Sequence, residues 1–202
     1  MDVAARNRWG GLALLLGVLI FIGSRVREHV DPTDRFLAVF MLVAFAAWFA
    51  GLLALRAQYR PRVGRLGGAG LMLTLVGIGA LALGHVPAFL LGLDGPWFVP
   101  IVLGTFALVA GVLLFGIAAL GGKVLPRWRV LPLVTGLVGL AWIVLAFDSR
   151  PVEGNPEAFL AMRTAFGIAW LPLALVLMTD RGRDTDAVKP GEIRAKQDTR
   201  RP

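Results

Sequence analysis

The sequence predicts an all-α polytopic membrane protein, in which six transmembrane helices form one bundle. Of its 202 residues, 57% are hydrophobic and 17% are charged, and the mean hydropathy is +0.73, which lies far outside the range of a soluble domain. The second observation is the spacing of the apolar segments. Each is close to the ~20 residues that cross a bilayer, and short polar connections separate them.

Six segments meet this length requirement, and a single membrane domain of residues 1–178 contains them all. They run at about 9–26, 36–55, 66–91, 97–120, 130–147 and 158–178. The first has the shortest apolar core and is similar to the apolar region of a signal peptide. Because Gly-Ser-Arg-Val-Arg follows it in place of a small-x-small cleavage motif, we expect it to be kept as a membrane anchor.

Prolines mark the beginning of every predicted span after the first. Each stands just ahead of an apolar segment, where its missing N–H is not needed and its fixed φ favours the first helical turn. They are Pro32, Pro61, Pro96, Pro126 and Pro156. Their spacing leaves one span and one short connection per unit, so consecutive helices are expected to be antiparallel neighbours.

Positive charge is divided unevenly between the two ends of the predicted bundle. The N-terminus and the connections 56–65 and 121–129 carry nine Lys and Arg residues, whereas the opposite side carries four together with seven acidic residues. Because basic connections stay in the cytoplasm, both termini are predicted to be cytoplasmic. The eighteen Arg against three Lys are typical of a GC-rich bacterial genome, so a bacterial plasma (inner) membrane is the expected location.

A basic hairpin occurs twice along the chain in the same orientation. Gly51 to Arg62 reads GLLALRAQYRPR, and Gly116 to Arg127 reads GIAALGGKVLPR, with identical residues at five of twelve positions. The second and third spans therefore correspond to the fourth and fifth, which predicts a parallel internal hairpin repeat. Duplication explains this architecture without specifying an activity.

Arg163 is the one ionisable residue well inside a predicted span, and such a residue is a functional candidate by default. It lies about 7.5 Å along the helix from Ala158, so its long side chain is also able to reach the outer surface. Two interpretations stay open. Either Arg163 anchors the helix, with Glu157, Glu153 and Asp148 as possible partners, or it binds an anionic ligand or lipid.

His85 stands near the outer end of the third span. The other histidine, His29, lies in an outer connection, so a haem held by two histidines is not expected, and nothing else in the sequence indicates a cofactor. A hydrogen-bonded or interfacial histidine is the simpler interpretation. If the third and sixth spans are neighbours, His85 and Arg163 flank one shallow polar pocket toward the outer leaflet, where they are the candidate contacts for a ligand or lipid.

Pro172 lies in the middle of the sixth span, where it leaves the carbonyl of Ile168 without its usual donor. A kink is expected there, and a hinge is its functional interpretation. Small residues allow close helix approach in a membrane and predict packing contacts. These positions are Ala47 with Gly51, Ala107 with Gly111, and Gly116 of the repeat.

Several classes of function lack the residues that they need. The chain has no cysteine, no nucleotide-binding glycine loop, no GxSxG or HExxH motif, no acidic pair inside a span and no cluster of metal ligands. We therefore expect no enzyme and no metal site. The net charge of +8 does not indicate nucleic-acid binding, because it follows from the cytoplasmic connections. Residues 179–202 form a basic tail with too little apolar content to fold, which predicts disorder.

The connection Leu125 to Trp128 reads LPRW and leads into an apolar span. Here the chain resembles small bacterial membrane proteins of unknown function, whose multi-helix bundles also carry Leu-Pro-Arg-Trp at the start of a late helix. The resemblance covers mainly the fourth and fifth spans. It implies a prokaryotic inner-membrane protein and no particular active site.

The favoured hypothesis from the sequence is a non-catalytic protein of the lipid bilayer that acts as an accessory, assembly or stabilising subunit of a larger membrane complex, or as a homo-oligomer. It depends on the small size, the tight connections and the missing catalytic motifs. The alternative is a small permease or lipid-binding protein that uses Arg163 and His85, with Pro172 as a hinge. An Arg163→Gln substitution separates the two, because the first predicts loss of assembly and the second loss of transport or lipid binding.

Overall fold

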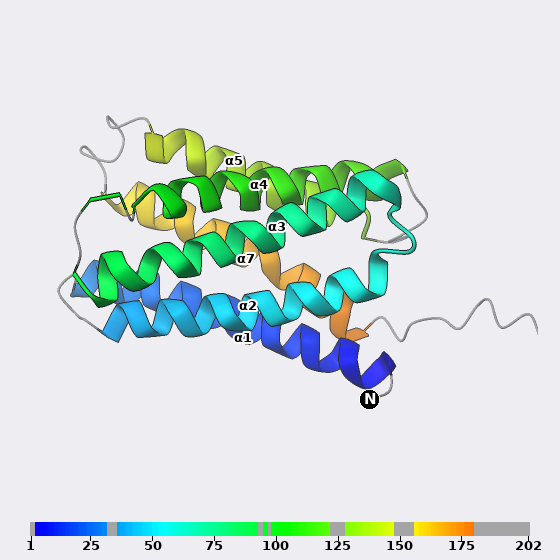
Figure 1. Cartoon of the computed structure of the whole chain (residues 1–202), viewed down its shortest axis with the longest axis horizontal. Coiled ribbons are helices and arrows are strands. Elements are labelled where there is room, and N and C mark those ends of the chain that lie inside the picture. Colours follow the sequence, from blue (N-terminus) through cyan, green and yellow to red (C-terminus); the bar gives the residue numbers. More distant parts are fainter. Residues whose placement is uncertain are drawn as a thin grey trace, which may run out of the picture.

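The computed structural model describes residues 3–31, 36–92, 95–96, 98–121, 128–147 and 156–179, and these residues contain helices and no strand. Six long helices run along the long axis of the molecule (Figure 1). They are α1 (Val3–Val30), α2 (Phe36–Tyr59), α3 (Gly64–His85), α4 (Phe98–Gly121), α5 (Leu131–Phe147) and α7 (Pro156–Thr179), and a π-helical turn, η1 (Val86–Leu90), extends α3. The prediction of an all-helical protein is confirmed.

Five of the six helices are long and apolar enough to cross a membrane, which supports a multi-pass membrane protein. The exception among the described helices is α5, which has 17 residues. At a rise of 1.5 Å per residue it is about 25 Å long, against a hydrocarbon core of ~30 Å. The predicted fifth span, residues 130–147, is therefore present as a helix but is shorter than the others.

Helix α1 extends well beyond the span that the sequence predicts. The prediction ended at residue 26, whereas the helix continues to Val30 and contains Arg25 and Glu28 in its last turns. These two side chains are three residues apart and form an ion pair on one helix face. The hydropathy of the chain falls at Arg25. The helix nevertheless continues to Val30, because Arg25 and Glu28 form an ion pair with each other.

The helices form a closed ring. Each packs against the helix before it and the helix after it in the chain, and α7 returns to pack against both α5 and α1. In Figure 1, α2, α3 and α4 form the nearer layer, and α1, α7 and α5 lie behind them. In this ring α3 and α7 occupy opposite positions. The last turns of α1 and α3 and the first turns of α2, α4 and α7 form one end of the ring, which we call the cavity end.

Glycines make the closest helix contacts. A Cβ atom at Gly51 of α2 would lie 2.6 Å from Cβ of Leu14 in α1, and one at Gly116 of α4 would lie 2.5 Å from the backbone nitrogen of Leu133 in α5. Between α3 and α4, four glycines face one another in pairs seven residues apart: Gly70 and Gly77 on one helix, Gly104 and Gly111 on the other. Seven residues are close to two helical turns, so each pair lies on one face.

The two alanines predicted as packing positions are less deeply buried than the glycines. Ala47 and Ala107 are half-buried, and Cβ of Ala47 would lie 3.3 Å from a Cβ placed at Gly17 of α1. The outer surface of the ring is apolar on all six helices, as expected where side chains face lipid. More than half-exposed examples are Leu16, Phe36, Val76, Leu103, Val144 and Leu175.

Three features of the sequence analysis fall partly outside the described residues. These are residues 122–127 of the second hairpin copy, the LPR of the LPRW motif, and the tail from residue 180 onward. The hairpin repeat and the disordered tail therefore stay predictions. Pro172 is described, and α7 continues through it as one helix from Pro156 to Thr179.

Candidate functional site

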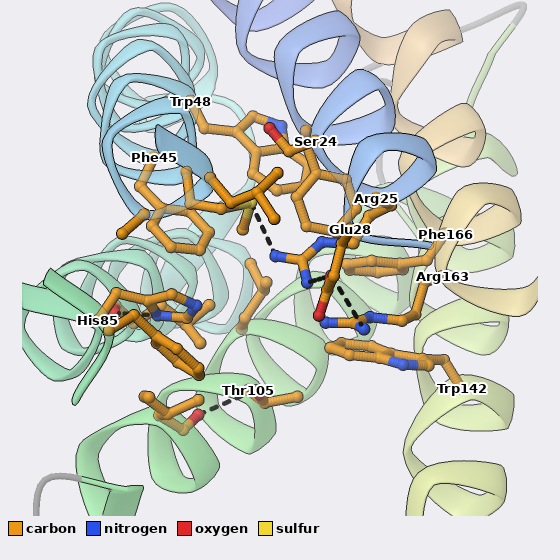
Figure 2. Close-up of a pocket in the computed structure, with 18 of the residues that line it drawn as sticks. Ser24, Arg25, Glu28, Phe45, Trp48, His85, Thr105, Trp142, Arg163 and Phe166 are labelled. Carbon is orange, nitrogen blue, oxygen red and sulfur yellow. Dashed lines mark hydrogen bonds and ion pairs between the residues drawn. The ribbon is translucent and has the colours of Figure 1, made fainter. Parts of the chain in front are cut away.

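A cavity of about 320 Å³ lies inside the cavity end of the ring. All six long helices and η1 contribute side chains to its wall (Figure 2). The polar and charged members are Ser24, Arg25, Glu28, His85, Thr105 and Arg163, and the aromatic members are Phe21, Phe45, Trp48, Phe89, Phe98, Trp142 and Phe166. The cavity thus combines an apolar, aromatic wall with a few converging charges, which is the usual composition of a small-molecule site.

Three charged side chains converge on one oxygen atom in this cavity. Oε2 of Glu28 accepts a hydrogen bond from Nη1 of Arg25, and Nη1 of Arg163 lies 3.4 Å from the same oxygen. Figure 2 shows both guanidinium groups directed at the carboxylate. Two cations share one anion, so the cluster carries a net charge of +1.

The cluster depends on the close approach of α1 and α7. A Cβ atom at Gly167 would lie 2.8 Å from Cγ1 of Ile22, so the glycine lets the two helices approach at this level. Arg163 lies one turn before Gly167, toward the cavity end. From there its side chain reaches Glu28, which lies in the last turns of α1.

Arg25 is the most deeply buried of the three charged residues. Its side chain is 6% exposed, compared with 22% for Arg163 and 39% for Glu28. Its Cζ atom lies 5.2 Å from the centre of the Phe21 ring, in cation–π geometry. Its Nη2 atom is directed at the sulfur of Met41, 2.7 Å away. A thioether is a weak acceptor, so an anionic oxygen at this position would be a better partner for Nη2.

His85 lies across the ring from the charged cluster. Its Nδ1 atom is 2.8 Å from the carbonyl oxygen of Leu81, and its ring packs between Phe45 and Phe89. A carbonyl oxygen can only accept, so Nδ1 carries a hydrogen. In the neutral imidazole Nε2 is then an acceptor. The edge of the imidazole opposite Nδ1 faces the interior of the cavity in Figure 2.

Indole groups form the deep part of the aromatic wall. Trp48 is 1% exposed and lies 5.2 Å from Phe21 and 5.1 Å from Trp170, measured between ring centres. Trp142 stacks on Phe166 with ring centres 5.3 Å apart. The indole nitrogens of Trp48 and Trp142 are buried and have no hydrogen-bond partner among the described residues, and neither has Nε of Arg25. Buried donors therefore outnumber acceptors around this cavity.

The structure places both residues that the sequence singled out on the wall of this one cavity. His85 and Arg163 come from α3 and α7, which face each other across the ring and are not adjacent helices. The described ion-pair partner of Arg163 is Glu28 of α1, whereas the sequence named acids near the start of its own helix as candidates. Of those acids, Glu157 is exposed, and residues 148 and 153 lie outside the described residues.

Sequence reasoning missed Arg25 and Glu28 because it counted both among the charges of the outer side, with Arg25 at the very end of the first predicted span and Glu28 beyond it. The Arg-x-x-Glu spacing was the available signal, since residues three apart lie on the same face of a helix and can pair. Comparisons with family models, with curated proteins and with solved structures found no match to this chain. The candidate site is therefore defined by its own geometry.

Proposed function

We propose that this protein binds a small amphipathic anion in the cavity, as a lipid-binding protein or small permease of the membrane. The observation that carries this proposal is the convergence of Arg25 and Arg163 on one carboxylate inside an apolar cavity. Buried charges are costly in the interior of a membrane protein and mark binding sites or pathways. Here two arginines from different helices meet one carboxylate on the wall of a cavity, where a ligand can reach them.

The head group of the ligand follows from the charges and donors of the site. A net charge of +1 favours an anion, and guanidinium groups bind carboxylates and phosphates through several N–H groups at once. The unpartnered N–H groups of Arg25, Trp48 and Trp142 also require acceptors. An oxyanion, either a carboxylate or a phosphate, balances the charge and accepts hydrogen bonds from the guanidinium groups.

The apolar part of the ligand follows from the walls of the cavity. Phe89 and Phe98 line the cavity and are both more than half exposed, so the aromatic wall continues to the surface of the ring. A volume of about 320 Å³ is at the small end for ligand sites. The site therefore suits an anionic head group, with an apolar chain that leaves the cavity past the two phenylalanines.

The same proposal assigns the cavity to the outer half of a bacterial plasma membrane. The basic residues between α2 and α3, namely Arg56, Arg60, Arg62 and Arg65, lie at the end of the ring opposite the cavity. Because basic connections stay in the cytoplasm, both termini are cytoplasmic and the cavity end faces outward. An amphipathic ligand then enters from the outer leaflet or from the outer aqueous phase.

Cysteine labelling tests this orientation, since the chain has no cysteine of its own. Leu91 is 61% exposed just after η1, and Pro61 is exposed between α2 and α3. In sealed cells we expect an impermeant maleimide to label a Leu91→Cys variant, and to label a Pro61→Cys variant only after the membrane is permeabilised. The reverse pattern would show that the cavity faces the cytoplasm.

Binding of a fluorescent fatty acid tests the proposed ligand class. Dansyl-undecanoic acid carries its carboxylate at the end opposite the fluorophore, and its methyl ester is a neutral control. In lipid nanodiscs, energy transfer from tryptophan to dansyl reports the bound probe. We expect the acid to bind at least about tenfold more tightly than the ester, because a charge-assisted pair contributes roughly 1.5–3 kcal/mol.

An Arg163→Gln variant should lose most of this preference for the acid. Arg27→Gln is the matched control, because it removes the same charge from an exposed position near the site that does not line the cavity. Competition by undecanoic acid and not by inorganic phosphate would indicate that the apolar chain is required. Equal binding of acid and ester to the unmodified protein would refute the proposal. It would favour the accessory-subunit hypothesis, which predicts instead that Arg163→Gln impairs assembly with other membrane subunits.

A further inference from the structure

We infer that Glu28 is an internal counter-ion that the anionic head group of the ligand displaces, so that the head group takes its place between Arg25 and Arg163. This inference rests on the proposed function. In the ligand-free protein the Glu28 carboxylate occupies the site, and binding exchanges this carboxylate for the oxyanion of the ligand.

The two arginines are the fixed part of the cluster. Arg25 is 6% exposed, its guanidinium lies against the Phe21 ring, and Nη2 is directed at the Met41 sulfur. Arg163 is 22% exposed and stands where Gly167 brings α7 close to α1. The Arg25 guanidinium cannot follow a departing carboxylate without losing these contacts, and the packing of α7 on α1 fixes the backbone of Arg163.

Glu28 is the mobile part of the cluster. Its side chain is 39% exposed and lies in the last turns of α1, only two residues before the helix ends at Val30. A partly exposed carboxylate is readily solvated when it leaves its partner, and exposed ion pairs contribute little to stability. The carboxylate can therefore move outward to water while the arginines stay.

The geometry at the shared oxygen also favours exchange. A single atom, Oε2, meets both guanidinium groups, so the position between the two Nη1 atoms accepts any oxyanion of similar size. When Glu28 leaves, the site has a charge of +2 in place of +1. A head group that enters there meets both guanidinium groups, and its second oxygen can approach Nη2 of Arg25, which otherwise meets sulfur.

A Glu28→Gln variant tests the exchange directly. With the competing carboxylate removed, dansyl-undecanoic acid should bind about threefold or more tightly than it does to the unmodified protein, the size expected when a partly exposed ion pair no longer competes. Asp31→Asn is the matched control. Asp31 is exposed at the end of α1 and does not line the cavity, so its loss changes the local charge equally without freeing the arginines.

The outcomes separate this inference from the proposed function. In one outcome the unmodified protein prefers the acid to its methyl ester, but Glu28→Gln binds the acid no more tightly than Asp31→Asn does. Glu28 then positions the arginines, and the inference that the ligand displaces it is wrong. If neither the unmodified protein nor Glu28→Gln prefers the acid, the proposed function itself fails.

A second measurement uses the unmodified chain and so does not depend on the folding of a variant. A water-soluble carbodiimide with glycine ethyl ester modifies accessible carboxyl groups, and peptide mass spectrometry reports the extent at Glu28. The probe is undecanesulfonate, because a sulfonate head group, unlike a carboxylate, is not converted by the carbodiimide. Exchange predicts that undecanesulfonate increases the modification of Glu28 about twofold or more, while the neutral methyl ester of dansyl-undecanoic acid does not. Protection of Glu28 by the sulfonate would overturn the inference, because it would show the carboxylate staying in place beneath the ligand.

Discussion

A Gly77→Ala substitution is expected to destabilise the protein strongly, although alanine is the better helix former. A Cβ atom at position 77 would lie 2.7 Å from the carbonyl oxygen of Gly104, and would also collide with the backbone of Leu108. Backbone atoms cannot rotate away, so α3 and α4 must separate. Overpacking of this kind costs about 3 kcal/mol or more, which for a chain of this size lowers the unfolding midpoint by about 6–12 °C.

Gly79→Ala is the matched control for this prediction. It makes the same substitution two residues later on the same helix, where a Cβ atom would meet nothing within 4 Å. Both variants gain the same helix propensity, so the difference between them isolates the contact with α4. Thermal unfolding in detergent, followed by circular dichroism, should show Gly79→Ala at or above the midpoint of the unmodified protein. Equal midpoints for the two variants would show that α3 and α4 do not meet at Gly77.

An Arg25→Met substitution is expected to weaken anion binding by a factor of about thirty or more, for a loss of about 2 kcal/mol, while leaving the fold as stable as before or more so. Arg25 is nearly fully buried and stands beside another cation that shares its only described carboxylate. Removal of one charge is destabilising when it leaves a buried partner unpaired, but here Glu28 is partly exposed and keeps Arg163 as its partner. Loss of a buried charged partner of the ligand weakens binding by about 2 kcal/mol or more, which is a factor of about thirty.

Two measurements on the same variant check this prediction. Titration with dansyl-undecanoic acid should show the loss of affinity, and thermal unfolding should show an unchanged or higher midpoint. Arg27→Met, at an exposed position two residues later, should change neither quantity appreciably. Substitution of a ligand-binding residue lowers the affinity and leaves the unfolding midpoint unchanged. Substitution of a structural residue lowers the midpoint and leaves the affinity unchanged. A destabilised Arg25→Met variant that still binds the acid would therefore assign Arg25 to the fold.

The helices could be predicted from the sequence because the signal for each is local. An apolar run of about 20 residues and a preceding proline are properties of one segment. The end of α1 was placed too early for the same reason. Arg25 and Glu28 end the apolar run, but they pair with each other, and Glu28 also pairs with Arg163, which is 135 residues farther along the chain.

The site could be predicted only where a residue is unusual for its surroundings. Arg163 stands out in an apolar span and His85 stands out near the end of one, so both were found. Arg25 is equally important to the geometry, but it stands at the edge of a span among other charges. The sequence made a shared pocket conditional on the third and sixth spans being neighbours, whereas α3 and α7 face each other across the ring and still line one cavity. Closure of the ring by α1 and α7 depends on Gly11 and Gly167, whose partners cannot be read from local spacing.

Native mass spectrometry of the protein purified in mild detergent from its host membrane tests the central claim most directly. The account predicts one bound anionic amphiphile per chain, present in the unmodified protein and in Arg27→Met, and lost in Arg25→Met. A chain that carries no amphiphile and instead co-purifies with a fixed stoichiometry of other membrane subunits would contradict it. That result would favour the accessory-subunit hypothesis and would identify the complex through its other members.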